Sequence, residues 1–248
     1  MKPNPHQLPP VLFEDQWFIA YNKPAGLLTA PDRWDKGLEN LMQMIHQQVS
    51  PAIFNAHRLD RDTSGVLLCA KDRPSLTAMC RMLERRQATK TYLALTRNVP
   101  VDLKGRIDRT VVQDFNRPGR MRSIRGHGRP CITDYEVLEA WKDQYALIQL
   151  KPLTGRTHQL RVHMSSMRCA IAADPLYGDG QGVYLSRIKP NYKPRKDGGE
   201  ERPLIGRLAL HAESLAFTHP FTQAATIIQA PLPKDFEVAL KYLRRFAS

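Results

Sequence analysis

Cysteine is scarce in this sequence, and its few copies are not arranged to bind a metal. The 248 residues contain four cysteines, at positions 69, 80, 131 and 169, without a C-x-x-C pair or neighbouring histidine ligands. A zinc site needs ligands that cluster in the sequence or in the fold. Cys69 and Cys80 lie among apolar residues and are expected to be buried as small hydrophobic side chains. We therefore expect no metal, and a reducing compartment such as the cytoplasm.

Long apolar runs are missing as well. The N-terminal stretch MKPNPHQLPP has no apolar core of the kind that directs secretion. No segment approaches the roughly 20 consecutive apolar residues of a membrane-spanning helix. The sequence therefore predicts a soluble, cytoplasmic protein without a membrane partner.

Acidic residues are too few to balance the basic ones. There are 37 Lys and Arg against 24 Asp and Glu, a formal net charge of +13. Such an excess favours a polyanionic partner, because cationic side chains neutralise phosphates and release counterions. A basic surface also fits simple solubility or an anionic membrane. With 42% hydrophobic and 25% charged residues, the composition is otherwise typical of a globular protein. The net positive charge makes nucleic acid the favoured partner.

The apolar spacing alternates between strand and helix patterns without a regular βαβ rhythm. Strands are predicted at residues 11–15, 17–26, 66–71, 90–97, 131–141, 145–153 and 208–220, and helices at 38–49, 74–87, 154–167 and 235–246. Residues 1–10 carry four prolines and are expected to form a flexible lead-in. This mixture predicts an α+β fold, with one domain over residues 11–248.

Two basic segments interrupt the regular patterning. Residues 117–129, RPGRMRSIRGHGR, hold five arginines and no acid, and residues 186–207 are rich in Pro, Gly, Lys and Arg. Both are predicted to be loops or hairpins outside the core. The plain alternative is a solvated charged loop, but such loops also position RNA through its phosphates without reading its sequence.

The stretch AHRLDRDTSGVLLCAKD, residues 56–72, resembles the start of a calcium loop. Asp60, Asp62, Ser64 and Gly65 occupy positions one, three, five and six of an EF-hand. Position twelve of that loop must be a bidentate acid, but here it is Lys71, and the residues before it form an apolar strand. Calcium binding is therefore excluded.

The same stretch offers a second use for its carboxylates. Asp60 precedes a buried strand and is flanked by Arg58 and Arg61. Nearby guanidinium groups keep a carboxylate ionised by lowering its pKa, and an ionised Asp can act as a nucleophile or base. The alternative is a turn in which Asp60 or Asp62 caps the backbone. The residues alone leave both interpretations open.

The string HRLDRDTSG resembles the catalytic motif H-R-L-D-x-x-T-S-G of the RluA-type RNA pseudouridine synthases, which act on large-subunit ribosomal RNA and transfer RNA. Every fixed position of the motif is present, at residues 57–60 and 63–65. Further blocks are similar to those of the family and follow its order: NKPAGL, KTYLAL, PLTGRTHQLRVHM, ADPLYG and RLALHA. The resemblance runs from residue 12 to about residue 221.

The resemblance implies that uridine in RNA is isomerised to pseudouridine. In that reaction the N1–C1′ bond breaks, the base turns over, and C5 joins C1′. It requires no redox cofactor, metal or ATP, so we expect no cofactor. Asp60 would supply the carboxylate, by attacking C1′ as in a retaining glycosidase, by adding to C6 of the base, or by promoting a glycal intermediate. The sequence does not choose among the three routes.

The resemblance also implies the other site residues. Tyr92 would stack on the flipped uracil, although an aromatic residue in a strand is otherwise a core residue. Arg161, rather than Arg156, would pair with Asp60; its alternative is a solvated helix face. The expected RNA contacts come from the motif and from the segment before Arg161, at His57, Arg58, Arg156 and His158. The implied fold is a mixed, largely antiparallel sheet flanked by helices, with a central basic cleft.

Many members carry a small basic RNA-binding module before the catalytic domain, but here the catalytic pattern begins near Val11, and we expect no such module. Substrate selection would then fall to the catalytic domain and its two basic segments. We expect a monomer that acts on transfer or ribosomal RNA and not on DNA. Two other functions remain open: an inactive RNA-binding protein on the same fold, and a metal-dependent nuclease. Retention of Asp60, Tyr92 and Arg161 argues against the first, and the lack of an acidic cluster argues against the second.

Overall fold

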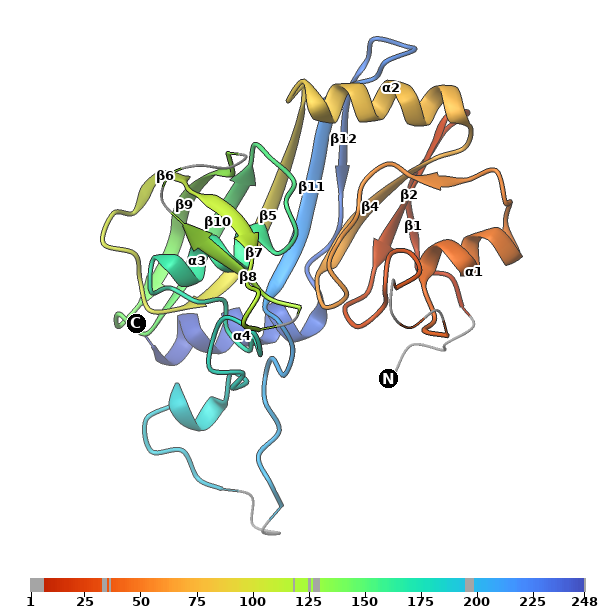
Figure 1. The fold of residues 1–248 in the computed structure, drawn as a ribbon. Coiled ribbons are helices and arrows are strands. Elements are labelled where there is room, and N and C mark those ends of the chain that lie inside the picture. The colour runs from red at the N-terminus through yellow and green to blue at the C-terminus, as the bar shows by residue number, and fades with distance from the viewer. Residues whose placement is uncertain are drawn as a thin grey trace. The chain divides into compact units, whose positions relative to one another are not determined.

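The computed structural model describes residues 7–32, 35, 37–117, 119–124, 126, 130–194 and 199–247. The chain divides into two compact units, which are described separately (Figure 1). Unit 1 comprises residues 1–90 and 212–231, and unit 2 comprises residues 91–211 and 232–248. The boundary falls within strand β5 (Ala88–Arg97) and strand β11 (Leu210–Thr218). The predicted organisation as one domain stays a prediction.

Unit 1 is built on antiparallel strands. Strand β2 (Phe18–Lys23) pairs with β1 (Val11–Glu14) on one side and with β4 (Ser64–Ala70) on the other. The short β3 (Phe54–Asn55) pairs with the end of β4, and β12 (Ala225–Gln229) pairs with β11. All seven residues of β4 are buried, which explains its continuous apolar run in place of a strict alternation.

The described residues of unit 1 also form two helices, α1 (Leu41–Gln48) and α2 (Arg73–Glu84). Helix α2 begins at Asp72, whose carboxylate accepts a hydrogen bond from the Ser75 N–H at 2.7 Å, with a proline in the first turn. Its Met79 is fully buried in a core with Phe18, Leu68 and other apolar residues of the strands. This core holds the sheet behind the motif strand β4.

Unit 2 contains a four-stranded antiparallel arrangement in the order β5–β10–β9–β6. The strands beside β5 are β10 (Tyr145–Pro152), β9 (Ile132–Trp141) and β6 (Lys104–Asp108). A separate hairpin pairs β7 (Thr110–Gln113) with β8 (Met121–Ile124). The helices are α3 (Gln159–Ser166), α4 (Lys234–Phe246) and a single 3₁₀ turn (Leu185–Arg187).

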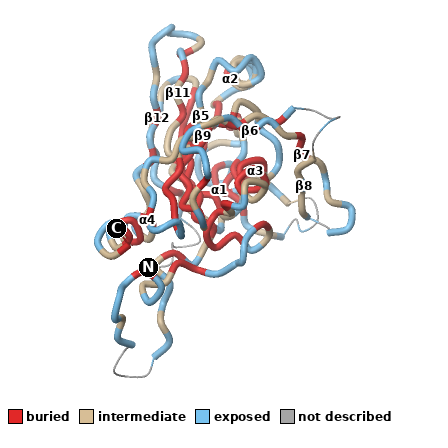
Figure 2. Tube along the Cα trace, turned by 90° about the vertical axis from the view of Figure 1, so that its left-hand side faces the viewer, coloured by how far each residue is buried: buried red, intermediate tan, exposed pale blue. Residues whose placement is uncertain are grey.

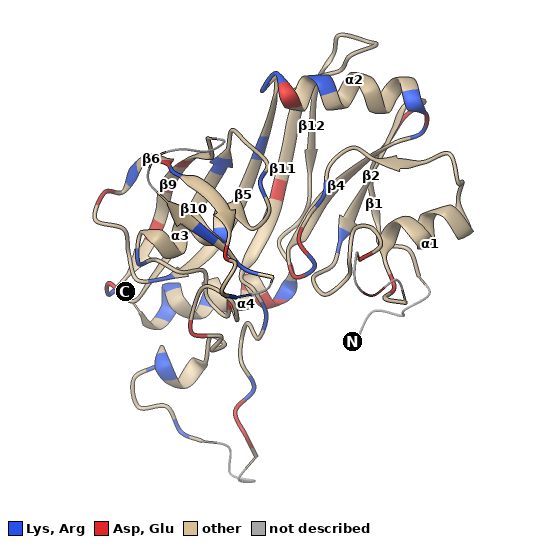
Figure 3. Ribbon diagram, viewed as in Figure 1, with Lys and Arg blue, Asp and Glu red and all other residues tan. Residues whose placement is uncertain are grey.

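Burial follows the central strands of each unit. In Figure 2 buried positions run along β5 and β11, whereas the tips of several loops are exposed. Lys and Arg residues, blue in Figure 3, occur in both units. The described residues contain no helix that is long and apolar enough to cross a membrane.

The predicted α+β class is confirmed, and each predicted strand and helix has a counterpart. The sequence pattern missed the short strands β3, β6, β7 and β12. Segment 117–129 contains β8 of the hairpin, while its residues 118, 125 and 127–129 lie outside the described residues. So do residues 195–198 of segment 186–207 and residues 1–6 of the expected lead-in.

Helix α3 is shorter than predicted. The expected helix began at residue 154, but the observed one begins at Gln159, after His158 in the left-handed conformation with φ 54°. The Gln159 side-chain oxygen accepts hydrogen bonds from the Thr154 hydroxyl at 2.8 Å and the Arg156 N–H at 3.1 Å. These bonds close residues 154–158 into a turn, which replaces the first helical turns.

Candidate active site

The motif loop of unit 1 leads directly into the buried strand β4. The Thr63 N–H donates to the Asp60 carbonyl at 3.2 Å, which makes the turn, and Thr63 and Ser64 are buried. Gly65 has φ +113°, and a Cβ at this position would lie 2.1 Å from the Ala212 carbonyl oxygen on β11. Only glycine fits this close approach. Thr63, Ser64 and Gly65 thus shape the turn that carries Asp60.

A buried lysine ties the upstream loop to the motif loop. Lys23, at the end of β2, is fully buried, and its ammonium donates to the carbonyls of Pro24 at 2.9 Å, Leu27 at 2.7 Å and Arg61 at 3.0 Å. A lysine ammonium has three protons, and each of them has a carbonyl acceptor here. One of these carbonyls belongs to the residue that follows Asp60. Lys23 therefore fixes the loop on the C-terminal side of the carboxylate.

Further hydrogen bonds hold the backbone on both sides of Asp60. The Gly26 N–H donates to the Arg61 carbonyl at 2.9 Å, and Arg61 Nε donates to the Gly26 carbonyl at 3.1 Å. The Thr29 hydroxyl donates to the Leu59 carbonyl at 2.9 Å and accepts from the Leu59 N–H at 3.2 Å. Leu59 is itself buried, whereas Asp60 is partly exposed. The backbone that carries Asp60 is thus held on both sides.

His57 and Arg58 differ in exposure. His57 Nε2 accepts a hydrogen bond from the Leu68 N–H of β4 at 3.1 Å, which places the proton of the neutral ring on Nδ1. Burial, with a smaller contribution from the charge of Lys90, lowers the pKa of His57 to about 3. His57 is therefore neutral at physiological pH and is held by β4. Arg58 is exposed, and the predicted contacts of both residues with RNA stay predictions.

Unit 2 contains the other predicted site residues. Tyr92 lies on β5 opposite Leu150 of β10 and is 9% exposed. Arg156 lies in the exposed turn before α3. His158 closes that turn, and its Nδ1 lies 2.7 Å from the Tyr177 hydroxyl. The structure thus gathers Arg156, His158 and Arg161 around the start of α3.

Arg161 is buried and forms a two-pronged ion pair. Its Nε lies 2.9 Å from Asp174 Oδ2 and its Nη2 lies 2.8 Å from Asp174 Oδ1, and the two residues are 4% and 0% exposed. The alternative of a solvated helix face is therefore wrong. The sequence reading did not foresee Asp174 as a partner, and the pairing of Arg161 with Asp60 stays a prediction.

The environment of Asp174 keeps it charged. Burial alone would raise the pKa of this carboxyl, but the hydrogen bonds and charge of Arg161 outweigh burial. The N–H groups of Leu176 and Tyr177 also donate to Asp174 Oδ1, at 2.9 and 3.0 Å. The pKa of Asp174 is therefore held below its ordinary value. Asp174 lies in the block ADPLYG, residues 173–178, but that block alone does not indicate that its carboxylate pairs with Arg161, 13 residues earlier in the chain.

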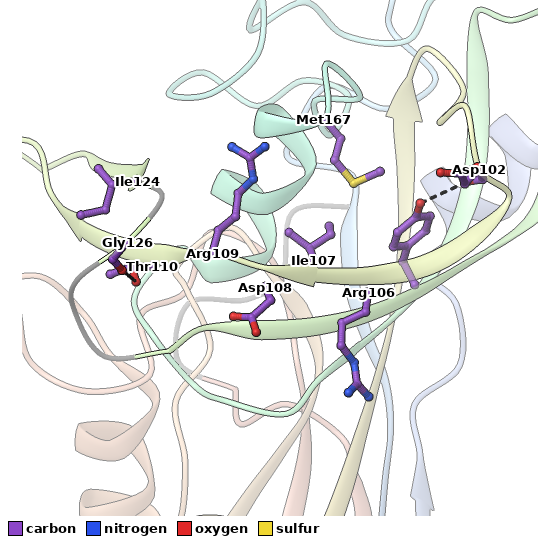
Figure 4. A pocket seen from close by; sticks show the side chains of 10 residues that line it. Asp102, Arg106, Ile107, Asp108, Arg109, Thr110, Ile124, Gly126 and Met167 are labelled. Atoms are coloured by element: carbon purple, nitrogen blue, oxygen red, sulfur yellow. Dashed lines mark hydrogen bonds between the residues drawn. The ribbon is translucent and has the colours of Figure 1, made fainter.

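Two cavities of unit 2 contain none of the predicted site residues. One, of about 510 Å³, is shown in Figure 4, where Ile107 and Arg109 lie on one side of the strand and Arg106 and Asp108 on the other. Its lining also includes Asp102, Thr110, Ile124, Gly126, Tyr135 and Met167. The second, also about 510 Å³, lies at the hairpin tip and is lined by Asp114, Phe115, Asn116, Arg117 and Arg122. Within the described ranges, no group of three or more His, Cys, Asp or Glu side chains is arranged for a metal ion.

Comparison with known proteins agrees with the motif. The family model described as RNA pseudouridylate synthase matches residues 17–166. The chain is 34% identical to the dual-specificity RNA pseudouridine synthase RluA of Escherichia coli K12, covering 92% of this chain and 96% of that protein. It is 33% identical to the ribosomal large subunit pseudouridine synthase D of Neisseria meningitidis serogroup B, covering 94% of this chain but 61% of that protein.

Solved structures agree with this assignment. Human RNA pseudouridylate synthase domain containing 1 matches 96% of this chain and 90% of its own, with a TM-score of 0.70 and 27% identity. The human domain containing 4 matches 94% of this chain and 92% of its own, with a TM-score of 0.68 and 26% identity. The chain belongs to the RNA pseudouridylate synthase family, whose members isomerise uridine in RNA.

Proposed function

We propose that this protein converts specific uridines of transfer or ribosomal RNA to pseudouridine, with Asp60 as the catalytic carboxylate. The observation that carries the proposal is that Lys23 and Thr29 hold the backbone on both sides of Asp60, a residue that is itself partly exposed. A reacting group must be held in position and yet remain accessible to substrate. The motif loop meets both requirements.

The proposed chemistry uses Asp60 on a uridine that has left the base stack. In the first route, Asp60 attacks C1′ as N1 departs, the base rotates, and C5 displaces the carboxylate from C1′. C5 then loses its proton and N1 gains one, so the carboxylate is regenerated and the product is an isomer of the substrate. Addition of Asp60 to C6, or a glycal intermediate, would give the same product. Each route uses the carboxylate of Asp60, and we propose that Arg161 pairs with that carboxylate.

The remaining site residues would hold the target nucleotide. Tyr92 would stack on the extruded uracil and assist the removal of the C5 proton. Extrusion of a base costs a few kcal/mol, and the exposed Arg58 beside the nucleophile would fill the vacated space and contact phosphate. His57, Arg156 and His158 would complete the substrate contacts. The two basic segments, 117–129 and 186–207, would grip RNA outside the site.

The substrate class follows from chemistry and from the names of relatives. The positive charge of +13 fits an RNA substrate. One relative is named a ribosomal large subunit enzyme, and another, from Vibrio vulnificus, a tRNA pseudouridine synthase. We therefore propose transfer or ribosomal RNA as the target, with the protein acting as a cytoplasmic monomer without a cofactor.

Mapping of pseudouridine across cellular RNA tests this proposal. Carbodiimide modification and primer extension would compare cells that lack the protein with cells that carry the wild type, Asp60→Ala or Asp62→Asn. We expect one or a few sites to disappear in the deletion and Asp60→Ala strains and to persist with Asp62→Asn, which alters the same turn. If every site persists without Asp60, the enzymatic role fails and an RNA-binding role takes its place.

A further inference from the structure

Tyr177 lies outside every predicted role, yet its side chain joins three parts of unit 2. It belongs to the loop after α3 and is 8% exposed. Its hydroxyl oxygen accepts a hydrogen bond from the Met121 N–H at 2.8 Å and lies 2.7 Å from His158 Nδ1. Met121 is the first residue of β8 in the hairpin, and His158 is the residue before α3. One phenol therefore connects the hairpin to the start of α3.

The ring of Tyr177 contacts two arginines. The guanidinium carbon of Arg161 lies 5.1 Å from the ring centroid, and that of Arg120, in the hairpin turn, lies 5.2 Å from it. Both distances are within the range of a cation–π interaction. The ring therefore lies against Arg161, the residue proposed to pair with Asp60, and against Arg120 of the basic segment proposed to bind RNA.

The backbone of Tyr177 is fixed as firmly as its side chain. Its N–H donates to Asp174 Oδ1 at 3.0 Å, and its carbonyl accepts from the Ser165 hydroxyl of α3 at 2.9 Å. Asp174 is the carboxylate that holds Arg161. A displacement of the hairpin would therefore act on Tyr177, and through its ring and its N–H on both members of the Arg161–Asp174 pair.

Packing alone does not account for the hydroxyl. Tyr177 packs with Val111, Cys131 and Val162 in an apolar cluster, and a phenylalanine would fill that space equally well. The oxygen instead forms two polar contacts that a phenylalanine lacks. A phenol has one proton and acceptor lone pairs, so it can accept from Met121 and donate to a neutral His158 at the same time.

We propose that Tyr177 is a positioning residue, through which RNA held by the β7–β8 hairpin sets the orientation of Arg161. This inference rests on the proposed function. RNA that engages the hairpin would fix Met121, and hence the phenol, so that Arg161 is oriented when the substrate is in place. Tyr177 would contact neither the base nor the sugar of the target uridine, and it would affect the reaction through the orientation of Arg161.

The test is Tyr177→Phe, which keeps the ring and removes the hydroxyl. Pseudouridine formation would be measured in single-turnover reactions as tritium release from RNA labelled at C5 of uridine, with the Kd for RNA measured separately. We expect the rate at saturating enzyme to fall about tenfold or more, with the Kd changed by less than about twofold. Arg120→Gln, which removes one ring contact, should lower the same rate by a smaller factor.

Tyr135→Phe is the matched control. Tyr135 is also buried, and its hydroxyl donates to the Asp102 carbonyl at 3.2 Å, in a different part of unit 2. Thermal unfolding of both variants would show that they are folded. The inference is overturned if Tyr177→Phe reacts at the wild-type rate, if only its Kd rises, or if Tyr135→Phe loses rate equally. Wild-type protein that releases no tritium would instead overturn the proposed function.

Discussion

The two units fix their predicted site residues through different groups. In unit 1 the ammonium of Lys23 and the hydroxyl of Thr29 hold the backbone on both sides of Asp60. In unit 2 the charged group itself is held, because the Arg161 guanidinium is bound on two nitrogens by Asp174 and is almost fully buried. The proposed nucleophile Asp60 would thus be positioned through its backbone, and its proposed partner Arg161 through the guanidinium itself.

The largest expected effect comes from removing the charge of Asp60. Asp60→Asn keeps the shape and should leave the backbone clamp intact, so the protein should fold while pseudouridine formation falls by about 10³-fold or more. Tritium release under single-turnover conditions measures the rate, and urea unfolding measures the stability. Asp62→Asn is the control in the same turn. Comparable losses in both variants would mean that the turn, and not the carboxylate, is required.

Removing the carboxylate that holds Arg161 should affect stability first. Asp174→Asn removes the carboxylate charge that holds the buried Arg161 guanidinium on two nitrogens, so the free energy of unfolding at pH 7 should fall by about 3 kcal/mol or more. The matched control is Asp179→Asn, because Asp179 is exposed and lies 3.6 Å from Arg97. Its loss should be under about 1 kcal/mol. Equal losses in urea unfolding would contradict the buried ion pair.

The same pair predicts a pH dependence with a definite sign. The pKa of Asp174 is lowered in the folded state, so its contribution to stability is present above the unfolded-state pKa of about 4 and is lost as the pH falls through the folded-state value. Wild-type protein should therefore lose more stability than Asp174→Asn when the pH is lowered below about 4. Parallel pH profiles for the two proteins would exclude this linkage.

The backbone clamp of unit 1 should contribute less to stability than the ion pair of unit 2. Lys23→Met keeps the aliphatic stem but leaves three carbonyls without this buried donor, so we expect a loss of about 2 kcal/mol. The loop beside Asp60 would also move, which should lower the rate by about tenfold. Lys104→Met, at an exposed lysine, is the control. A stable Lys23→Met protein with full activity would show that the clamp is dispensable.

The structure agrees best with the sequence-based predictions where a local sequence pattern determines the conformation of the chain. The string HRLDRDTSG placed Asp60 before a buried strand, and the close approach of Gly65 to Ala212 explains why the motif needs glycine there. The first residue of α3 could not be predicted from the local sequence pattern. The Gln159 side chain closes the preceding turn, and His158 adopts a left-handed conformation. The block ADPLYG contains Asp174, but its pairing with Arg161 was not predicted, because an ion pair between a helix and a later loop leaves no periodic signal. Strand β6, KGRID, carries too many charges to show strand alternation.

His57 offers a pH test of the motif loop that does not involve Asp60. Its pKa is lowered to about 3 in the folded state, so folding favours the neutral ring. That contribution to stability is present above the unfolded-state pKa of about 6.5 and is lost as the pH falls toward 3, by up to about 1.4 kcal/mol per pH unit. His57→Gln, whose amide oxygen can still accept from Leu68, should lose less stability between pH 7 and pH 5. An unchanged pH profile would show that the ring is not held neutral.

The smallest expected effect comes from arginine substitutions in the hairpin, which should reduce RNA affinity without reducing the saturated rate. Arg117 and Arg122 are exposed and line the cavity at the hairpin tip. If each contacts one phosphate, Arg117→Gln and Arg122→Gln should each weaken RNA binding severalfold at low salt and reduce the slope of log K against log salt by about 1. The saturated rate should change little, because exposed arginines outside the site supply affinity and not transition-state contacts.

Lys104→Gln, an exposed cation on β6, is the control. A variant with an unchanged salt slope but a reduced saturated rate would place that arginine with the positioning groups around Tyr177 and Arg161, and would remove it from the RNA grip.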